Sequence, residues 1–115
     1  MSTLLCLALA IYHEARGEPK QGQYAVAEVV LNRSDARNKT VCDVVREPYQ
    51  FSWTKHKSNF NIPDNDSWDQ AKSIASKSLQ SKTNFTDGAT FFNTKRVGVR
   101  FGKSKKVVIG NHIFY

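Results

Sequence analysis

The sequence predicts an α+β domain, with helices first and a small antiparallel sheet last. Up to residue 81, apolar side chains recur at the three- and four-residue spacing of helices. After Asp87 and Gly88 the period changes, and apolar residues alternate with others as in half-buried strands. A chain of 115 residues can build one hydrophobic core but not two, so residues 1–115 are expected to form a single domain.

The first predicted helix carries an apolar run that can only be buried. Ser2 or Thr3 can cap its start, and Gly17 follows its predicted end near Ala15. Residues 4–11 contain no polar side chain, so this part of the helix is expected to be buried.

A second helix is predicted from Lys20 to Arg33, followed by a polar loop over residues 32–39. Residues 40–46 predict a short helix or turn. Glu28 lies in the second helix, but its angular position does not mark it as a site residue. The predicted core stripe of this helix consists of Ala25, Val26, Val29 and Val30.

The last predicted helix follows a mainly polar loop over residues 54–66. Asp66 or Ser67 is expected to cap it, and it runs from about Trp68 to Ser81. Its predicted buried face consists of Trp68, Ala71, Ile74, Ala75, Ser78 and Leu79.

Three short strands are predicted in the last part of the chain. They cover residues 89–93, 97–101 and 107–109, with a turn at residues 102–105 before the third strand. Residues 110–115 close the chain after these strands.

The charge balance predicts a polyanionic partner. The chain carries 17 Lys and Arg against 10 Asp and Glu, a net charge of +7, which favours nucleic acid or an anionic cell envelope without choosing between them. No Lys or Arg precedes the apolar run and no clear cleavage site follows it, so we expect no signal peptide. The run is too short to cross a membrane as a helix.

The cysteines and histidines do not predict a metal site. Cys6 and Cys42 are far apart, and His13, His56 and His112 share no metal-ligand spacing. We therefore expect no metal and no cofactor. The two cysteines are either buried thiols or one disulfide, which would imply an oxidising destination.

Two carboxylates remain as candidates for chemistry. Glu14 and Glu18 lie where the apolar helix ends, and partial desolvation and the negative end of the helix dipole both raise the pKa of a carboxyl group there. A carboxylic acid of this kind suits a general acid. The alternative is a surface salt-bridge cluster in which Arg16 pairs with both residues.

Several segments in order resemble the SleB/CwlJ-type cell-wall hydrolase family. The strongest are Tyr12-His13-Glu14-Ala15-Arg16-Gly17-Glu18-Pro19 and the following Ala25-Val26-Ala27-Glu28-Val29-Val30-Leu31-Asn32-Arg33. Residues 40–45, 50–52, 88–93 and 109–114 agree in the same order, so the resemblance covers nearly the whole chain.

The resemblance implies a lysozyme-like fold and cleavage of peptidoglycan glycan strands. It places the catalytic acid at Glu14 and gives Glu18 a supporting place in the catalytic pair. It also implies a disulfide between Cys6 and Cys42, and a chain of this size resembles a phage-type single-domain lysin.

The implied reaction is cleavage between N-acetylmuramic acid and N-acetylglucosamine, by lytic transglycosylation or, as the alternative, by hydrolysis with the same acid. The groove is expected to bind sugar through aromatic stacking and hydrogen bonds. Its predicted lining consists of Tyr12, Tyr49, Gln50, Phe51, Ser52, Trp53, Asn93 and His112.

The expected partners are peptidoglycan and the anionic envelope, and we expect a monomer that binds no nucleic acid. Lys103, Lys105 and Lys106 are candidates for contact with wall polymers. Action on the wall without a signal peptide implies release by a holin, delivery in a virion, or lysis. The competing classes are a basic nucleic-acid-binding module, supported by the aromatic and basic residues at 91–101, and an inactive glycan-binding relative.

Overall fold

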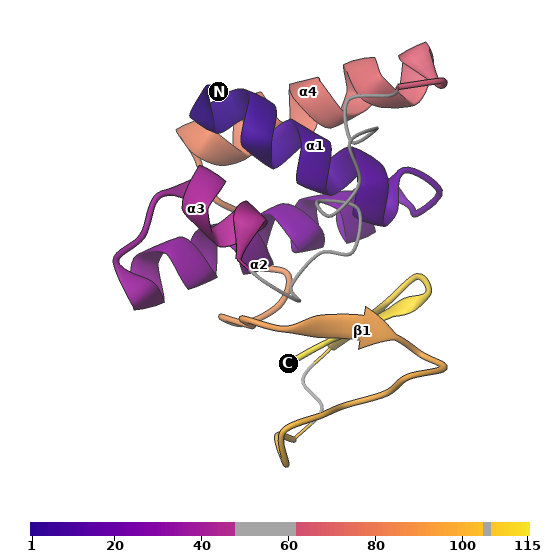
Figure 1. The fold of residues 1–115 in the computed structure, drawn as a ribbon. Helices are drawn as coiled ribbons and strands as arrows, with labels where there is room; N and C mark the ends of the chain where they lie inside the picture. The colour runs from indigo at the N-terminus through magenta and orange to yellow at the C-terminus, as the bar shows by residue number, and fades with distance from the viewer. Residues whose placement is uncertain (48–61, 105–106) are drawn as a thin grey trace.

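The computed structural model describes residues 1–47, 62–104 and 107–115 and shows helices followed by a three-stranded antiparallel sheet. The predicted α+β class is confirmed. The helices lie together on one side, and the sheet packs beneath α2 (Figure 1). The elements are α1 (Thr3–Ala15), α2 (Lys20–Arg37), α3 (Val41–Arg46), α4 (Asn65–Gln80), β1 (Phe92–Thr94), β2 (Val107–Ile109) and β3 (His112–Phe114).

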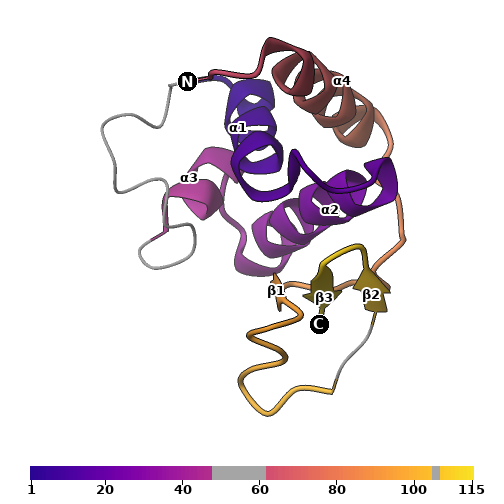
Figure 2. The same ribbon diagram turned by 90° about the vertical axis from the view of Figure 1, so that its right-hand side faces the viewer.

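Helix α1 is the centre of the helical layer. It contacts α2, α3 and α4, which surround it in Figure 2. Each side chain from Cys6 to Tyr12 is no more than 2% exposed. The predicted burial of the apolar run is therefore confirmed from Cys6 to Ile11. A helix stretch that is hydrophobic all round is stable only when other elements cover it. Ser2 caps the helix by accepting a hydrogen bond from the Leu5 N–H at 3.1 Å.

Helix α2 is longer than predicted, so the expected loop from Asn32 is wrong. Two polar side chains in its last turns have distant partners: Asn32 donates to the Ala89 carbonyl at 2.9 Å, and Arg33 donates to the Thr90 carbonyl. These contacts let polar residues continue the helix. It ends at Asn38, whose left-handed φ of 52° and N–H bonds back to the last turn form a C-cap.

Helix α4 begins earlier than predicted. Its cap is Asp64, not Asp66 or Ser67, because the Asp64 carboxylate accepts the Ser67 N–H at 3.1 Å and the Ser67 hydroxyl at 2.6 Å. Trp68 is half-buried and packs edge-on against Tyr12, with ring centroids 5.9 Å apart.

The sheet has the order β1-β3-β2, in which Phe114 of β3 pairs with Phe92 of β1 and Val107 of β2. Residues 97–101, predicted as a strand, form no strand. Gly98 and Phe101 have positive φ values of 77° and 63°, and this backbone cannot continue an extended ladder. The third strand comes instead from residues 112–114.

A buried carboxylate fastens the segment after α4 onto α2. Glu28 is 1% exposed and accepts hydrogen bonds from the Thr83 hydroxyl, the Phe85 and Thr86 N–H groups, and the Thr86 hydroxyl. Since a buried charge is stable only when its hydrogen-bonding capacity is filled, Glu28 is a structural residue. Its hydrogen bonds hold the segment that connects the end of α4 to the start of the sheet.

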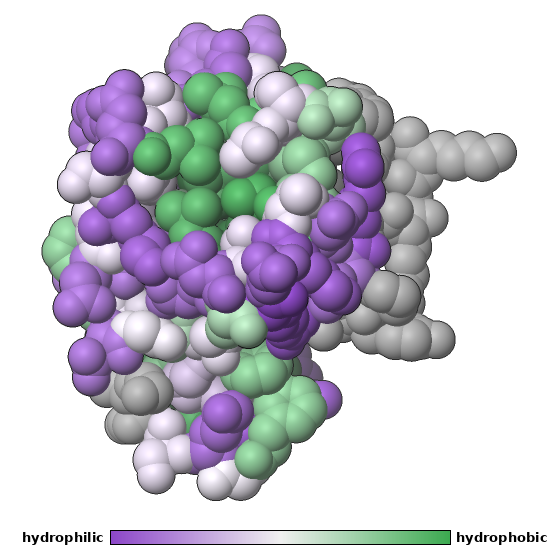
Figure 3. All heavy atoms as spheres, turned by 90° about the vertical axis from the view of Figure 1, so that its left-hand side faces the viewer, coloured by the Kyte–Doolittle hydropathy of each residue, from purple (hydrophilic) through white to green (hydrophobic). Residues whose placement is uncertain are grey.

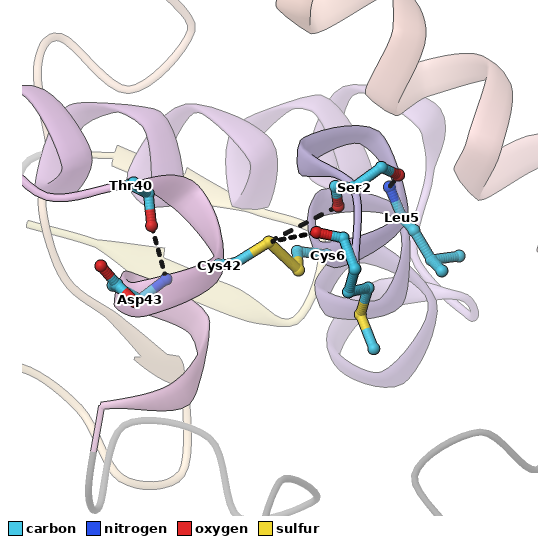
Figure 4. The surroundings of a disulfide bond; sticks show 7 residues. Ser2, Leu5, Cys6, Thr40, Cys42 and Asp43 are labelled. Atoms are coloured by element: carbon cyan, nitrogen blue, oxygen red, sulfur yellow. Dashed lines mark hydrogen bonds between the residues drawn. A yellow bond between two sulfur atoms is a disulfide. The ribbon is translucent and has the colours of Figure 1, made fainter.

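A disulfide joins Cys6 of α1 to Cys42 of α3, with the Cα atoms 5.3 Å apart (Figure 4). This is the pairing that the family resemblance implies. Thr40 caps α3 beside it by accepting the Asp43 N–H at 3.1 Å. The bond therefore ties two capped helix starts together.

Hydrophilic side chains cover most of the face shown in Figure 3, around one cluster of apolar side chains. None of the helices within the described ranges has the length and apolar character needed to cross a membrane. Over the whole surface of the described residues, the exposed large apolar side chains are Met1, Leu79, Phe85, Val97, Phe101 and Val108.

Reduction of the disulfide is expected to lower the free energy of unfolding. Its cysteines are 36 positions apart, and the loop-closure entropy of a loop of this size corresponds to about 4 kcal/mol. Urea denaturation with and without reductant measures the difference. The Cys6→Ser/Cys42→Ser variant is the control and should not respond to reductant. An unchanged wild-type midpoint under full reduction would contradict the prediction.

Candidate active site

A cavity of about 190 Å³ lies where the end of α1 meets the sheet. Glu14 reaches it from the last turn of α1, Arg33 from α2 and His112 from β3. Helices and strands thus contribute jointly to one site. The remaining lining residues come from β1 and the turn after it: Phe92, Asn93, Thr94 and Val97.

Glu14 is the acid of this cavity. Burial raises its pKa from an ordinary 4.5 to about 7, and the positive charge of Arg33 opposes part of this rise. The direction agrees with the sequence prediction. A carboxyl group with this pKa is partly protonated near neutral pH, so it can donate a proton and later accept one.

Arg33 is a site residue that sequence reasoning missed. It is 4% exposed, its Nε donates to the Thr90 carbonyl, and its guanidinium lies 5.1 Å from the centroid of the Phe91 ring. Burial, aided by Arg37, lowers its pKa to about 10, which leaves it charged at neutral pH. The signal in the sequence is that Arg33 is the last residue of the family motif Ala25–Arg33. Hydrophobic periodicity alone indicates only that Arg33 lies at the end of a helix.

His112, which the sequence analysis expects in a sugar-binding groove, lines the same cavity and is 7% exposed. Burial lowers its pKa, and the nearby Glu18 carboxylate opposes this shift. The imidazole is therefore mainly neutral at neutral pH, when it can donate one hydrogen bond and accept another. Its Nδ1 lies 3.4 Å from Glu18 Oε1.

Glu18 does not line the Glu14 cavity. Its Oε1 accepts the Asn111 N–H at 2.7 Å, in the turn between β2 and β3. Gly110 in this turn has φ of 56°, and a Cβ there would lie 2.8 Å from Glu18 Oε1. The structure therefore separates the two carboxylates: Glu14 faces the cavity, and Glu18 holds the turn that carries His112.

The salt-bridge cluster that was the alternative for Glu14, Arg16 and Glu18 does not form. Among the described residues, no ion pair joins Arg16 to Glu14 or Glu18. The Arg16 guanidinium instead lies 4.8 Å from the centroid of the Tyr12 ring and donates to its hydroxyl at 2.5 Å. Among the residues that the structure describes, no cation forms an ion pair with Glu14.

Tyr12 belongs to the core, which corrects its predicted place in the groove. Its side chain is 1% exposed, and its hydroxyl also accepts the Asp64 N–H at 3.1 Å. Five other predicted groove residues lie outside the described residues, so the structure does not place them: Tyr49, Gln50, Phe51, Ser52 and Trp53.

Asn93 lines the Glu14 cavity, as predicted, and also a second cavity of about 150 Å³ beside it. Its side-chain amide donates to the Gly98 carbonyl at 3.0 Å and to the Tyr115 hydroxyl at 2.5 Å. Arg33 and Phe92 line both cavities as well. The two hollows therefore adjoin through three shared residues.

The family model described as Cell Wall Hydrolase matches residues 17–115. The chain belongs to the cell wall hydrolase family. The match begins after Glu14, so the assignment of this residue rests on its geometry. The matched range includes Arg33, Asn93 and His112, which line the cavity.

Similar sequences and structures agree with this family. A spore cortex-lytic enzyme of Halalkalibacterium halodurans is 33% identical over 94% of this chain, but the chain spans only 33% of that enzyme's length. The spore cortex-lytic enzyme of Bacillus subtilis is 50% identical over 40% of this chain.

Two solved structures share the fold. The catalytic domain of the germination-specific lytic transglycosylase SleB from Bacillus anthracis has a TM-score of 0.81 and 28% identity, covering 97% of this chain and 92% of that one. The catalytic domain of the Bacillus cereus SleB protein gives the same TM-score and identity, covering 88% of that chain. The expected lysozyme-like architecture is the one that these catalytic domains share with this chain.

The raised pKa of Glu14 predicts a pH-dependent cost to stability. The folded protein favours the protonated acid, so stability falls as pH rises from 4.5 to about 7, a total of about 3 kcal/mol. Glu14→Gln removes this loss, and the variant should exceed the wild type in stability at pH 8 but not at pH 4. Urea denaturation at the two pH values measures the gap. Asp69→Asn, at an exposed carboxylate, is the control and should show almost no such change; a gap for Glu14→Gln that is independent of pH would contradict the assignment.

Proposed function

We propose that this chain cleaves the glycan strands of peptidoglycan between N-acetylmuramic acid and N-acetylglucosamine, with Glu14 as general acid and then general base. The observation that carries the proposal is a carboxyl group with a pKa of about 7 facing a cavity. Membership in the cell wall hydrolase family supports the substrate class. The similarity to a lytic transglycosylase catalytic domain supports the reaction type.

In the first step, protonated Glu14 donates its proton to the glycosidic oxygen. The bond between that oxygen and muramyl C1 breaks, and positive charge develops on the muramyl ring. Arg33 favours the carboxylate that Glu14 becomes, because its guanidinium charge lowers the pKa of Glu14. Burial and Arg33 act in opposite directions on the pKa of Glu14 and leave it at about 7, so both protonation states are accessible near neutral pH.

A second carboxylate is the usual partner of the acid in hydrolytic glycosidases. All ten acidic residues of the chain lie within the described ranges, and Glu14 alone among them lines its cavity. Two of the other carboxylates are hydrogen-bonded elsewhere: Glu28 to Thr83 and Thr86, and Glu18 to the Asn111 N–H. This distribution favours a mechanism that needs one carboxylate.

The second step that fits a single carboxylate is intramolecular. The Glu14 carboxylate removes the proton from the muramyl C6 hydroxyl, and the C6 oxygen bonds to C1. The product is a 1,6-anhydromuramyl end, Glu14 is protonated again, and no water is consumed. Hydrolysis with water in place of the C6 hydroxyl is the competing outcome.

The proposed supporting roles follow from position. Asn93 and His112 line the cavity and carry hydrogen-bonding groups for sugar hydroxyls and acetamido groups. Glu18 is a positioning residue, since it holds the turn and lies 3.4 Å from the His112 ring nitrogen. None of these residues replaces the proton donor.

We extend the proposal to where the protein acts. The net charge of +7 and the exposed Lys103 favour retention on an anionic bacterial envelope. Lys105 and Lys106 lie outside the described residues. A disulfide between α1 and α3 suits an oxidising destination such as the periplasm or the cell exterior.

The products of peptidoglycan digestion test the proposed reaction. Mass spectrometry of a wild-type digest should show muramyl ends that lack one water relative to hydrolytic ends, because the C6 oxygen replaces water as the nucleophile. Glu14→Gln should lower the rate by at least about a hundredfold, since a positioned general acid contributes that much. Ends that carry the added water would replace transglycosylation by hydrolysis, and lysis unchanged in Glu14→Gln would overturn the assignment of the acid.

The pH dependence of kcat/KM tests the protonation state of Glu14. The reactive free enzyme carries protonated Glu14, so kcat/KM should fall above the pKa of about 7, by about tenfold for each further pH unit. Initial rates on solubilised glycan strands at constant ionic strength give the profile. A rate that stays level or rises between pH 7 and 9 would show that another group supplies the proton.

A further inference from the structure

The second cavity has four lining residues that the Glu14 cavity lacks: Phe91, Arg100, Phe101 and Tyr115. They come from the segment before β1, the turn region before β2 and the residue after β3. Nothing in the proposed acid-base steps uses them. The cavity therefore needs an explanation of its own.

Its wall is a cluster of aromatic rings. Phe91 stacks on Tyr115 with centroids 5.7 Å apart and planes 19° apart, and it contacts Phe101 with centroids 5.0 Å apart. Phe101 is 71% exposed and has a positive φ of 63°. An aromatic residue rarely adopts this conformation, and exposure of its ring leaves the cost without compensation from burial. An exposed ring held in a costly conformation is a candidate contact for a ligand.

The same cavity is cationic. Arg100 lines it, the Arg33 guanidinium lies 5.1 Å from the Phe91 centroid, and Lys103 Nζ lies 5.5 Å from that centroid. None of the lining residues is acidic. An aromatic surface binds the apolar face of a sugar ring, and a guanidinium binds a carboxylate by charge-assisted hydrogen bonds. The combination fits a sugar that carries a carboxylate.

We propose that this cavity is a subsite for an acidic muramyl unit of the glycan strand, with its ring on Phe101 and its carboxylate at Arg100. The inference rests on the proposed function, because Arg33, Phe92 and Asn93 line both cavities and a strand cleaved at Glu14 can continue into the second. The carboxylate belongs to the lactyl group or to the peptide stem. The substrate class is therefore muramyl glycan with a free acidic group, in preference to a neutral N-acetylglucosamine polymer.

Binding to the Glu14→Gln variant, which is expected to cleave the glycan at least about a hundredfold more slowly, tests the subsite. Three soluble ligands of equal length are compared by calorimetry: muramyl glycan with intact stems, muramyl glycan trimmed by an amidase to the lactyl carboxylate, and a neutral N-acetylglucosamine oligomer. Arg100→Gln added to this background should weaken binding of an acidic ligand by about tenfold. It should change the affinity for the neutral oligomer by less than about twofold. Phe101→Ala should weaken binding of all three because it removes the stacking surface.

Lys77→Gln is the matched control, since it removes one exposed positive charge from α4. It should leave all three affinities unchanged. A loss in Arg100→Gln with the trimmed glycan identifies the lactyl carboxylate as the ligand, and a loss confined to the intact glycan identifies the stem. Equal affinity of the three ligands, no effect of Arg100→Gln, or an equal effect of Lys77→Gln would overturn the subsite.

A parallel digestion of the trimmed and intact glycans by the wild type separates the two proposals. Cleavage without an effect of Arg100→Gln on binding overturns the subsite and leaves the proposed function standing. Absence of both cleavage and binding overturns both. An Arg100-dependent affinity for a single-stranded oligonucleotide that matches or exceeds the affinity for the glycans would overturn the subsite in favour of nucleic acid.

Discussion

The burial of the middle of α1, from Cys6 to Tyr12, is the constraint on which the rest of the structure depends. A helix without a polar side chain between Leu4 and Ile11 must be covered by α2, α3 and α4. Its last turn then emerges at the edge of the core and carries Glu14 into a cavity. Burial of that carboxyl group raises its pKa to about 7. Helix packing is therefore also the source of the raised pKa on which the proposed chemistry rests.

The other elements arrange fixed groups around this acid. Arg33 is held by the Thr90 carbonyl and by the Phe91 ring, so its charge stays beside Glu14. His112 enters from β3, and Glu18 holds the preceding turn through the Asn111 N–H. In the proposed mechanism, a fixed environment would let a single carboxyl group act as acid and then as base, because no reorganisation is needed between the steps. The absence of a second carboxylate from the residues that line the cavity is consistent with a mechanism that uses Glu14 in both steps.

The sheet extends the site beyond the reacting bond. Its three short strands place Asn93 and His112 at the Glu14 cavity and bring Tyr115 beside Phe91. The residues that connect the strands carry the strained Phe101 and the basic Arg100. A glycan strand is long and repetitive, so an enzyme that acts on it gains affinity and register from contacts away from the cleaved bond. We propose that the second cavity, lined by Arg100 and Phe101, offers such contacts.

The sequence by itself determined the burial of α1, the place of Glu14 at its end and the direction of its pKa, because apolar runs and helix ends are local patterns. Only the tertiary structure decided which partners these residues meet. The continuation of α2 beyond Arg33 and the place of Arg33 in the site depend on carbonyl groups 57 positions away, at Ala89 and Thr90. The separation of Glu14 from Glu18 likewise depends on Asn111, 93 positions from Glu18. Local periodicity reports which face is buried, but it carries no information on which distant backbone will satisfy a polar side chain.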